Sequence, residues 1–292
     1  MIKQRLDKFL ADQHPDISRS AIAKYIQRGD VKVDGEAVII PATLIDDSDD
    51  IDFTPITKPD YSTEIANFAA HNVIYMNNRV IVIDKPAGML VHAKGGIDSE
   101  FTVADFARAK YNADEAAENA SNRIGIVHRL DRATSGVMIL ARNNAAASFL
   151  ARQFSDRKAH KTYLAVTEQA PRVPAAKLDL PLSRNPRRPA TFMVNAKGKP
   201  ATTIYQTLKV YSDGRALVKL HPQTGRTHQL RVHLAYIGCP IVGDHIYGDG
   251  HYDDRLMLHA QKLEITIPAD NGTHERRVFI AKVPEVFTRY GK

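Results

Sequence analysis

Residues 124–142 constrain the fold more than any other part of the chain. Two apolar runs, 124–127 and 137–141, are typical of buried strands. The connection between them carries two arginines, a histidine, an aspartate, two hydroxyl side chains and a glycine. Such a set of polar and charged side chains is unfavourable in a hydrophobic core. We therefore expect this connection to be a functional loop held by a rigid scaffold.

Asp131 is the only carboxylate in this connection, with Arg129 and Arg132 close to it on either side. Nearby positive charge favours the ionised form of a carboxylate, so we expect Asp131 to be charged at neutral pH. The residue types leave two interpretations open. Asp131 is either a reactive group or one member of an arginine–aspartate cluster that closes a tight turn, because ion-pair networks also arise for structural reasons.

The nine residues 128–136, His-Arg-Leu-Asp-Arg-Ala-Thr-Ser-Gly, resemble the catalytic motif of the RluA-type pseudouridine synthases almost letter for letter. In that family the aspartate is the catalytic residue, which implies that role for Asp131. The resemblance also implies that Arg129, two places earlier, fills the gap that the target base leaves when it is extruded from the RNA stack.

Other segments are similar to the same family. Residues 85–92 resemble a family motif, apart from His92, where proline is commoner. Residues 224–238, followed by 240–248, match a second strong motif, and 256–260 resemble the last family strand. Pro86 and Gly88 would shape the backbone beneath the site, although an ordinary turn explains them equally well. The likeness covers nearly the whole chain.

Two more side chains gain roles from this resemblance. Residues 160–166 alternate as a strand does, and the family places an active-site tyrosine at Tyr163, where its ring would stack on the target base. Without the resemblance, a strand tyrosine is more often part of a core. Thr227 is a plausible N-cap for a helix that Gly238 ends. The resemblance implies that Arg231 on this helix pairs with the catalytic aspartate.

The first 60 residues have a different pattern. Residues 5–13 show helical spacing, and a second helix starts near Ser18 or Ser20 and ends at Gly29. Residues 31–35 alternate into an Asp-Gly turn, which is a hairpin signal. Together these features resemble an S4 RNA-binding domain over roughly residues 3–53. Two prolines, Pro55 and Pro59, and the polar run 57–64 indicate a linker.

Charge is unevenly distributed along the chain. The net charge is +7, yet residues 1–60 hold 8 Lys/Arg and 12 Asp/Glu, which leaves 32 and 21 for the other 232 residues. A basic body suggests a polyanionic partner. Within the first domain, six basic residues could face RNA phosphates, or could simply form a solvated helix face: Arg5, Lys8, Arg19, Lys24, Arg28 and Lys32.

Composition excludes several protein classes. The apolar runs are too short to span a bilayer, and the N-terminus lacks the apolar stretch of a signal peptide. The single cysteine, Cys239, rules out an internal disulfide and fits a reducing compartment. We therefore expect a cytoplasmic protein that does not associate with membranes.

Two other functions compete with this interpretation. A metal-dependent hydrolase would use the histidines, but His228 and His233 are five residues apart, and a helical zinc pair needs a spacing of four with an adjacent glutamate. A non-catalytic RNA-binding assembly factor would need the S4-like region and the basic loops, but would have no need of Asp131. The intact acid–arginine connection argues against the second possibility.

The sequence therefore predicts an α+β protein with the pseudouridine synthase fold, built on a large mixed, mainly antiparallel sheet, plus a small α/β S4 domain. We expect the S4-like domain and the start of a linker at 1–60 and the catalytic domain at 61–292. The predicted activity is isomerisation of uridine to pseudouridine in RNA, which the resemblance suggests is large-subunit ribosomal RNA. No metal or cofactor is expected, and a monomer is expected. Whether Asp131 attacks C1′ or removes a sugar proton stays open, as does the uridine modified.

Overall fold

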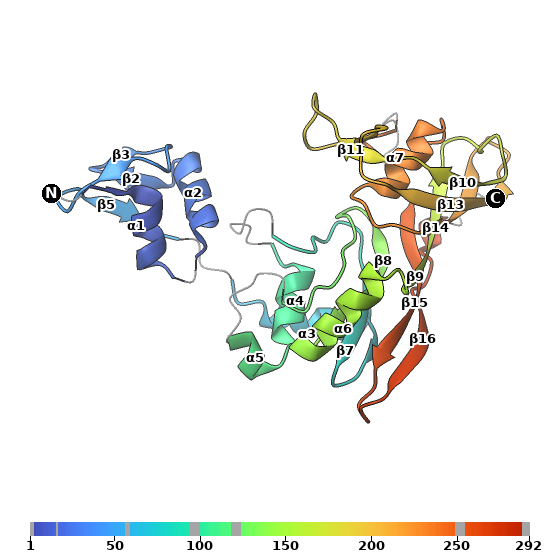
Figure 1. Cartoon of the computed structure of the whole chain (residues 1–292), viewed down its shortest axis with the longest axis horizontal. Coiled ribbons are helices and arrows are strands. Elements are labelled where there is room, and N and C mark those ends of the chain that lie inside the picture. The colour runs from blue at the N-terminus through green and yellow to red at the C-terminus, as the bar shows by residue number, and fades with distance from the viewer. Residues whose placement is uncertain are drawn as a thin grey trace.

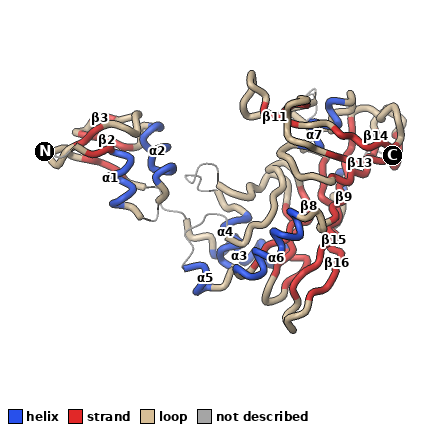
Figure 2. Tube along the Cα trace, viewed as in Figure 1, coloured by secondary structure: helices blue, strands red, loops and turns tan. Residues whose placement is uncertain are grey.

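The computed structural model of the chain describes residues 3–15, 17–55, 59–93, 100–117, 124–248 and 255–287. Its helices are α1 (Leu6–Gln13), α2 (Arg19–Arg28), α3 (Ser62–Asn72), α4 (Val103–Ala109), α5 (Ala113–Ala117), α6 (Asn144–Ser155) and α7 (Gln229–Tyr236). Figure 1 shows their order along the chain, and Figure 2 separates helices from strands.

Strands β1–β5 belong to the N-terminal part and the others to the body. They are β1 (Gln4–Arg5), β2 (Val31–Val33), β3 (Glu36–Ala37), β4 (Leu44–Ile45), β5 (Ile51–Phe53), β6 (Val73–Met76), β7 (Val80–Lys85), β8 (Ser135–Ala141), β9 (His160–Thr167), β10 (Ala175–Asp179), β11 (Leu182–Arg184), β12 (Phe192–Val194), β13 (Thr202–Val210), β14 (Ala216–Pro222), β15 (Leu258–Pro268) and β16 (His274–Ile280).

The N-terminal unit packs two helices on small sheets. The hydroxyl of Ser18 accepts from the backbone N–H of Ala21 at the start of α2, and Gly29 ends α2 in the left-handed conformation at φ 79°. Strands β2 and β3 form the predicted hairpin around Asp34-Gly35. Its core is a cluster of its own, formed by Leu6, Leu10, Ile22, Tyr25, Ile26, Val31 and Ile45.

The body is built on one nine-stranded sheet in the order β10-β13-β14-β9-β15-β8-β7-β6, with β16 paired to β15. Among the described strands, only β15 and β8 pair in parallel, with His259 opposite Ser135 and Ala260 opposite Gly136. All other pairings in this sheet are antiparallel. The prediction of a large, mainly antiparallel mixed sheet is confirmed.

Strand β8 is buried along its whole length, because helices cover both faces of the sheet at this point. Val137 and Ile139 belong to a cluster with Leu150 of α6. Met138 and Leu140 belong to another cluster that includes residues of α3 and α4. A strand covered on both faces carries a continuous apolar run instead of an alternating one, which explains the sequence 137–141. The central sheet therefore fixes the start of β8 rigidly.

One prediction for the central stretch was wrong. Residues 124–127 do not form a strand, because Gly125 takes a left-handed turn at φ 73° and only an isolated bridge joins Ile126 to Leu140. The two short helices α4 and α5 lie before this stretch, and residues 118–123 lie outside the described residues. Part of the predicted linker, 56–58, also lies outside them. No described helix is long and apolar enough to cross a membrane.

Candidate active site

The polar connection enters the sheet through Gly136, whose φ is 117°. A Cβ atom there would lie 2.2 Å from the backbone oxygen of Ala260 on the neighbouring strand β15. Real Cβ atoms do not approach an oxygen so closely, and φ is in the region that favours glycine. Gly136 therefore permits the parallel pairing of β8 with β15 directly after the connection.

The connection is tied to the segment that follows β7. Gly88 donates its N–H to the carbonyl of Arg132 at 2.8 Å, and the Arg132 Nε atom donates to the carbonyl of Gly88 at 2.8 Å. Lys85, which is fully buried, donates to the carbonyls of Pro86, Met89 and Arg132 at 2.8, 2.9 and 3.2 Å. Burial lowers the pKa of Lys85 to about 7. Three carbonyl acceptors oppose that shift, because only the ammonium has three protons to donate.

The histidine of the connection has a structural part. The N–H of Ile139 donates to the Nε2 atom of His128 at 3.0 Å, and the ring stacks on Phe154 with centroids 4.5 Å apart. Burial lowers the pKa of His128 to about 3, helped by the charge of Lys161. His128 is therefore neutral at neutral pH, and its Nε2 atom accepts a hydrogen bond that holds the connection against β8.

A cavity of about 390 Å³ opens beside this connection. Its volume falls in the range of roughly 300–1,000 Å³ that is usual for small-molecule sites. Asp131, Tyr163, Arg129 and Arg231 all line it, so the structure brings together four of the residues that the sequence analysis selected. The remaining lining includes His128, Leu130, Phe154, Lys161, Thr224, His228 and Leu258.

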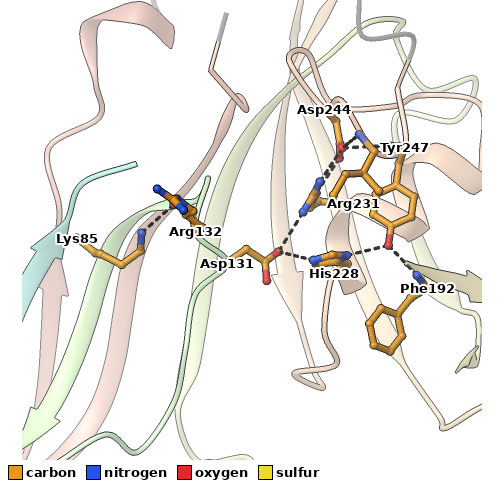
Figure 3. A network of polar contacts seen from close by, with 9 residues as sticks. Lys85, Asp131, Arg132, Phe192, His228, Arg231, Asp244 and Tyr247 are labelled. Carbon is orange, nitrogen blue, oxygen red and sulfur yellow. Dashed lines mark hydrogen bonds and ion pairs between the residues drawn. The ribbon is translucent and has the colours of Figure 1, made fainter. Parts of the chain in front are cut away.

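Asp131 faces two nitrogen atoms across the cavity, as Figure 3 shows. Its Oδ2 atom lies 3.6 Å from Nη1 of Arg231 and 4.0 Å from Nε2 of His228. Neither distance is a hydrogen bond, and no other residue that the structure describes donates one to the carboxylate. The Asp131 side chain is 20% exposed. It is therefore a carboxylate that faces a buried guanidinium and whose oxygens are available to an incoming group.

Arg231 makes its shortest contacts with a different acid. Its Nε and Nη2 atoms donate to the two oxygens of Asp244 at 2.8 and 2.7 Å, while Asp131 is 3.6 Å away. The ion pair between Arg231 and Asp131 that the resemblance implies is thus present, but it is longer than the ion pair between Arg231 and Asp244. Burial would raise the pKa of Asp244, yet the hydrogen bonds and charge of Arg231 outweigh it and lower the pKa. Asp244 holds Arg231 so that its free nitrogen points to Asp131.

The helix that carries Arg231 begins later than predicted. Thr227 does not cap α7; the preceding residue is His228, which has φ 56° and no capping hydrogen bond from its side chain. Leu230 and Leu234 are buried, and Arg231 is only 5% exposed. The helix therefore presents a buried guanidinium to the site from its first turn.

Tyr163 and Arg129 differ in how firmly they are held. Tyr163 lies on β9 and packs against two hydrophobic clusters, which fixes its ring. Burial and the charge of Asp131 raise the pKa of Tyr163, so its hydroxyl stays protonated. Arg129 is exposed and makes no hydrogen bond or ion pair with the part of the chain that the structure describes. Its planar guanidinium is free to reach a ligand.

The six basic residues of the N-terminal unit are all exposed, but not all are free. Arg5 and Arg19 both bind Asp7, at 2.9 and 3.0 Å, and Arg28 pairs with Asp30 at 3.0 Å. Lys8, Lys24 and Lys32 have no ion pair within the described ranges. Half of the predicted RNA-facing charge is therefore shared with acidic partners.

The histidines that the structure describes do not gather into a metal site. His233 contacts Thr203 Oγ1 at 3.0 Å and the carbonyl of Leu180 at 2.9 Å, whereas His228 faces Asp131. Among the residues that the structure describes, no group of three or more His, Cys, Asp or Glu side chains could hold a metal ion. The geometry thus gives no support to the metal-dependent hydrolase.

Sequence reasoning missed several members of the site. Lys161 is two residues before Tyr163 on β9 and lines the same cavity, so strand alternation could have selected it. Burial lowers the pKa of Lys161. Asp244 and Tyr247 lie within a segment that resembled the family, but nothing in their spacing indicated contacts with Arg231 and His228. Those contacts depend on the tertiary fold.

Comparison with known proteins agrees with this geometry. The family model described as RNA pseudouridylate synthase matches residues 79–236, which include the connection, β9 and Arg231. The S4 domain model matches residues 4–51. The chain belongs to the RNA pseudouridine synthase family. The synthase is therefore an enzyme with an S4 domain at its N-terminus, and both resemblances noted in the sequence are confirmed.

Individual relatives cover most of the synthase. It is 38% identical over 247 residues to an uncharacterized RNA pseudouridine synthase of Aquifex aeolicus, covering 84% of this chain and 77% of the relative. It is 36% identical to the ribosomal large subunit pseudouridine synthase D of Xanthomonas campestris, covering 91% and 82%. The solved structure of human RNA pseudouridylate synthase domain containing 4 is 26% identical with a TM-score of 0.58, covering 77% and 93%.

Proposed function

We propose that this enzyme isomerises uridines of large-subunit ribosomal RNA to pseudouridine, with Asp131 as the catalytic residue. The observation that carries the proposal is the Asp131 carboxylate, which faces the cavity near Arg231 without receiving a hydrogen bond from any described residue. In the reaction the base leaves C1′, rotates and rejoins through carbon. One carboxylate suffices, because the base is never released.

The choice of RNA is supported by relatives. Proteins 36% and 31% identical to this chain, from Xanthomonas campestris and Vibrio parahaemolyticus, are named ribosomal large subunit pseudouridine synthases D and C. We propose that the enzyme acts on this RNA in the cytoplasm and that it does so as a monomer. Mapping pseudouridines in total RNA of a deletion strain, by carbodiimide treatment and primer extension, tests the substrate. At least one large-subunit position should lose its modification and regain it when the gene is restored; unchanged large-subunit RNA would refute the assignment.

The cavity supports a division of labour during base extrusion. The target base must leave its stack, at a cost of a few kcal/mol. Tyr163 offers a fixed ring for the extruded base, and Arg129 offers a planar group that can fill the gap, which an ammonium cannot do. Arg129→Lys should therefore convert structured RNA nearly as slowly as Arg129→Ala. Lysine restoring most of the rate would mean that only charge matters at this position.

The N-terminal unit is proposed to add RNA affinity, with domains at 1–60 and 61–292. Its hydrophobic core contains only residues between 6 and 53, which supports an independent unit. Its proposed phosphate contacts are Arg5, Lys8, Arg19, Lys24, Arg28 and Lys32. Removing residues 1–60 should weaken RNA binding and leave the maximal rate of the body nearly unchanged. An unfolded remnant, or a loss confined to the maximal rate, would contradict the division.

A further inference from the structure

His228 has an unusual backbone for the position it holds. It adopts φ 56° and ψ 15° directly before α7, a left-handed conformation that few non-glycine residues take. Such strain persists where the surroundings determine it, and it is concentrated at functional sites. The side chain is only 15% exposed, and both ring nitrogens face polar atoms. The backbone therefore holds the imidazole in one orientation inside the site.

One ring nitrogen contacts a tyrosine that is itself anchored. The Nδ1 atom of His228 lies 2.8 Å from the hydroxyl of Tyr247, and the backbone N–H of Phe192 donates to the same hydroxyl at 2.8 Å. Figure 3 shows this chain of contacts. Because the amide of Phe192 can only donate, it occupies a lone pair of the oxygen. The hydroxyl proton of Tyr247 is then free to be donated to Nδ1.

The other ring nitrogen faces Asp131. Nε2 of His228 is 4.0 Å from Oδ2 of Asp131. A carboxylate only accepts hydrogen bonds, so a nitrogen lone pair aimed at it would be repelled, whereas an N–H is attracted. Burial lowers the pKa of His228; the charges of Asp131 and Asp244 oppose this shift, and those of Arg231 and Arg129 add to it. A neutral ring has one proton, and both neighbours favour placing it on Nε2.

We propose that His228 is a positioning residue that directs an Nε2–H group at the Asp131 carboxylate, with Tyr247 fixing that tautomer. The inference rests on the proposed function of Asp131 as the catalytic residue. The separation of 4.0 Å is longer than a hydrogen bond, as catalytic contacts often are before substrate binds. Nε2 of His228 and Nη1 of Arg231 both face Oδ2 of Asp131, which leaves Oδ1 for the nucleoside.

Tyr247 is held by a strand outside the main sheet and also contacts Arg231. Phe192 begins β12, which pairs with β11 in a two-stranded hairpin outside the main sheet. The ring of Tyr247 lies against the guanidinium of Arg231, with 5.2 Å between the guanidinium carbon and the ring centroid. One tyrosine therefore touches both groups that approach Asp131, His228 through its hydroxyl and Arg231 through its face.

Two substitutions of His228 separate its two contacts. His228→Asn places an amide near the Nδ1 position and suits a left-handed backbone, because asparagine visits that region readily. It does not reach Asp131. His228→Gln extends an amide N–H to about the Nε2 position and so keeps a donor for the carboxylate. Tyr247→Phe removes the group that fixes the tautomer, and Tyr236→Phe at an exposed tyrosine is its matched control.

Single-turnover conversion and RNA affinity are measured for each full-length variant. We expect His228→Asn to lower the conversion rate about ten- to a hundredfold, as misplaced catalytic groups do, with affinity changed less than about twofold. His228→Gln should recover a substantial part of the rate, and Tyr247→Phe should fall between His228→Asn and the unchanged Tyr236→Phe. Equal rates for His228→Asn and the parent enzyme, or a loss seen only in affinity, would overturn the inference.

A spectroscopic readout tests the tautomer without any reaction. Nitrogen-15 chemical shifts of the His228 ring should show a protonated Nε2 and an unprotonated Nδ1 at neutral pH, and Tyr247→Phe should shift this balance. A ring protonated only on Nδ1 would overturn the inference. If Asp131→Asn were fully active, the proposed function itself would fail. If Asp131→Asn were inert and His228→Asn were normal, only the role of His228 would fail.

Discussion

In the N-terminal unit, Asp7 is 5% exposed and accepts four hydrogen bonds of 2.9–3.2 Å from Arg5 and Arg19. In the body, Asp131 is also surrounded by positive charge, yet its nearest cationic nitrogen is 3.6 Å away and no described residue donates a hydrogen bond to it. Both positions read as an aspartate near arginines in the sequence. The difference is saturation: the lone pairs of Asp7 are occupied, and those of Asp131 are not.

The body contains its own saturated aspartate next to the unsaturated one. Asp244 accepts two hydrogen bonds from Arg231 and two more from the backbone N–H groups of Ile246 and Tyr247. Asp244 takes the two shortest hydrogen bonds of Arg231. Asp131 therefore lies in the electric field of a buried cation while its own lone pairs stay unoccupied by that cation. A structural acid thus sets the environment of the proposed catalytic one, and the three aspartates can be distinguished by substitution.

Asp244→Asn should have the largest effect on stability. It leaves Arg231, whose side chain is 6% exposed, without its bidentate partner, and breaking a buried pair in this way costs roughly 3–5 kcal/mol. The melting temperature of the body should fall by roughly 10 °C, and conversion of uridine should be lost. Asp213→Asn, at an exposed acid paired with Arg215 at 3.6 Å, is the matched control. Equal melting of the two variants would contradict the assignment of Asp244.

Asp7→Asn should have a smaller and strictly local effect. The substitution removes charge-assisted hydrogen bonds from Arg5 and Arg19 that together contribute roughly 1.5–3 kcal/mol, and both arginines are about half exposed. Hydrogen exchange should accelerate in α1 and α2 and stay unchanged in β8. Equal acceleration in both places would show that the two parts unfold together, and the comparison between them would lose its basis.

The loss of stability of the N-terminal unit on acidification should be smaller than the effect of Asp7→Asn. Hydrogen bonding and charge from Arg5, then from Arg19, lower the pKa of Asp7 from 3.8 to about 2. A lowered native pKa gives stability that is present above pH 3.8 and lost as pH falls toward 2. We expect a loss of no more than about 2 kcal/mol, reduced further by salt. The difference between the parent and Asp7→Asn in urea unfolding should shrink steadily as pH falls from 4 to 2; a constant difference down to pH 2 would contradict it.

Much of the fold could be predicted because local signals agreed with it. Ser18 and Gly29 mark the ends of α2, and the apolar run 137–141 marks a strand buried on both faces. Two local signals were misleading. The apolar run 124–127 looked like a strand, but Gly125 puts a turn in it. Thr227 looked like the N-cap of α7, but His228 takes that position because tertiary contacts stabilise its left-handed backbone. Sequence spacing carries no record of such contacts.

The candidate site was predictable only in part, for a related reason. Asp131, Arg129, Tyr163 and Arg231 were selected by resemblance, and the structure places them around one cavity. Asp244 could not be assigned, because its bond to Arg231 joins α7 to a loop 13 residues later. The pairing of acids with arginines is decided by which groups the fold buries, and charge in the sequence does not distinguish a saturated carboxylate from a free one.

The most direct test compares the parent enzyme with Asp131→Asn on one unmodified RNA that carries the target uridine, with Asp114→Asn on α5 as an exposed control. The account predicts that Asp131→Asn melts within about 2 °C of the parent, because no hydrogen bond from a described residue is lost, and binds RNA within about twofold, because phosphate contacts dominate affinity. Single-turnover conversion should fall at least roughly a thousandfold. Conversion at a near-normal rate, or a loss of folding and binding together with activity, would contradict the account.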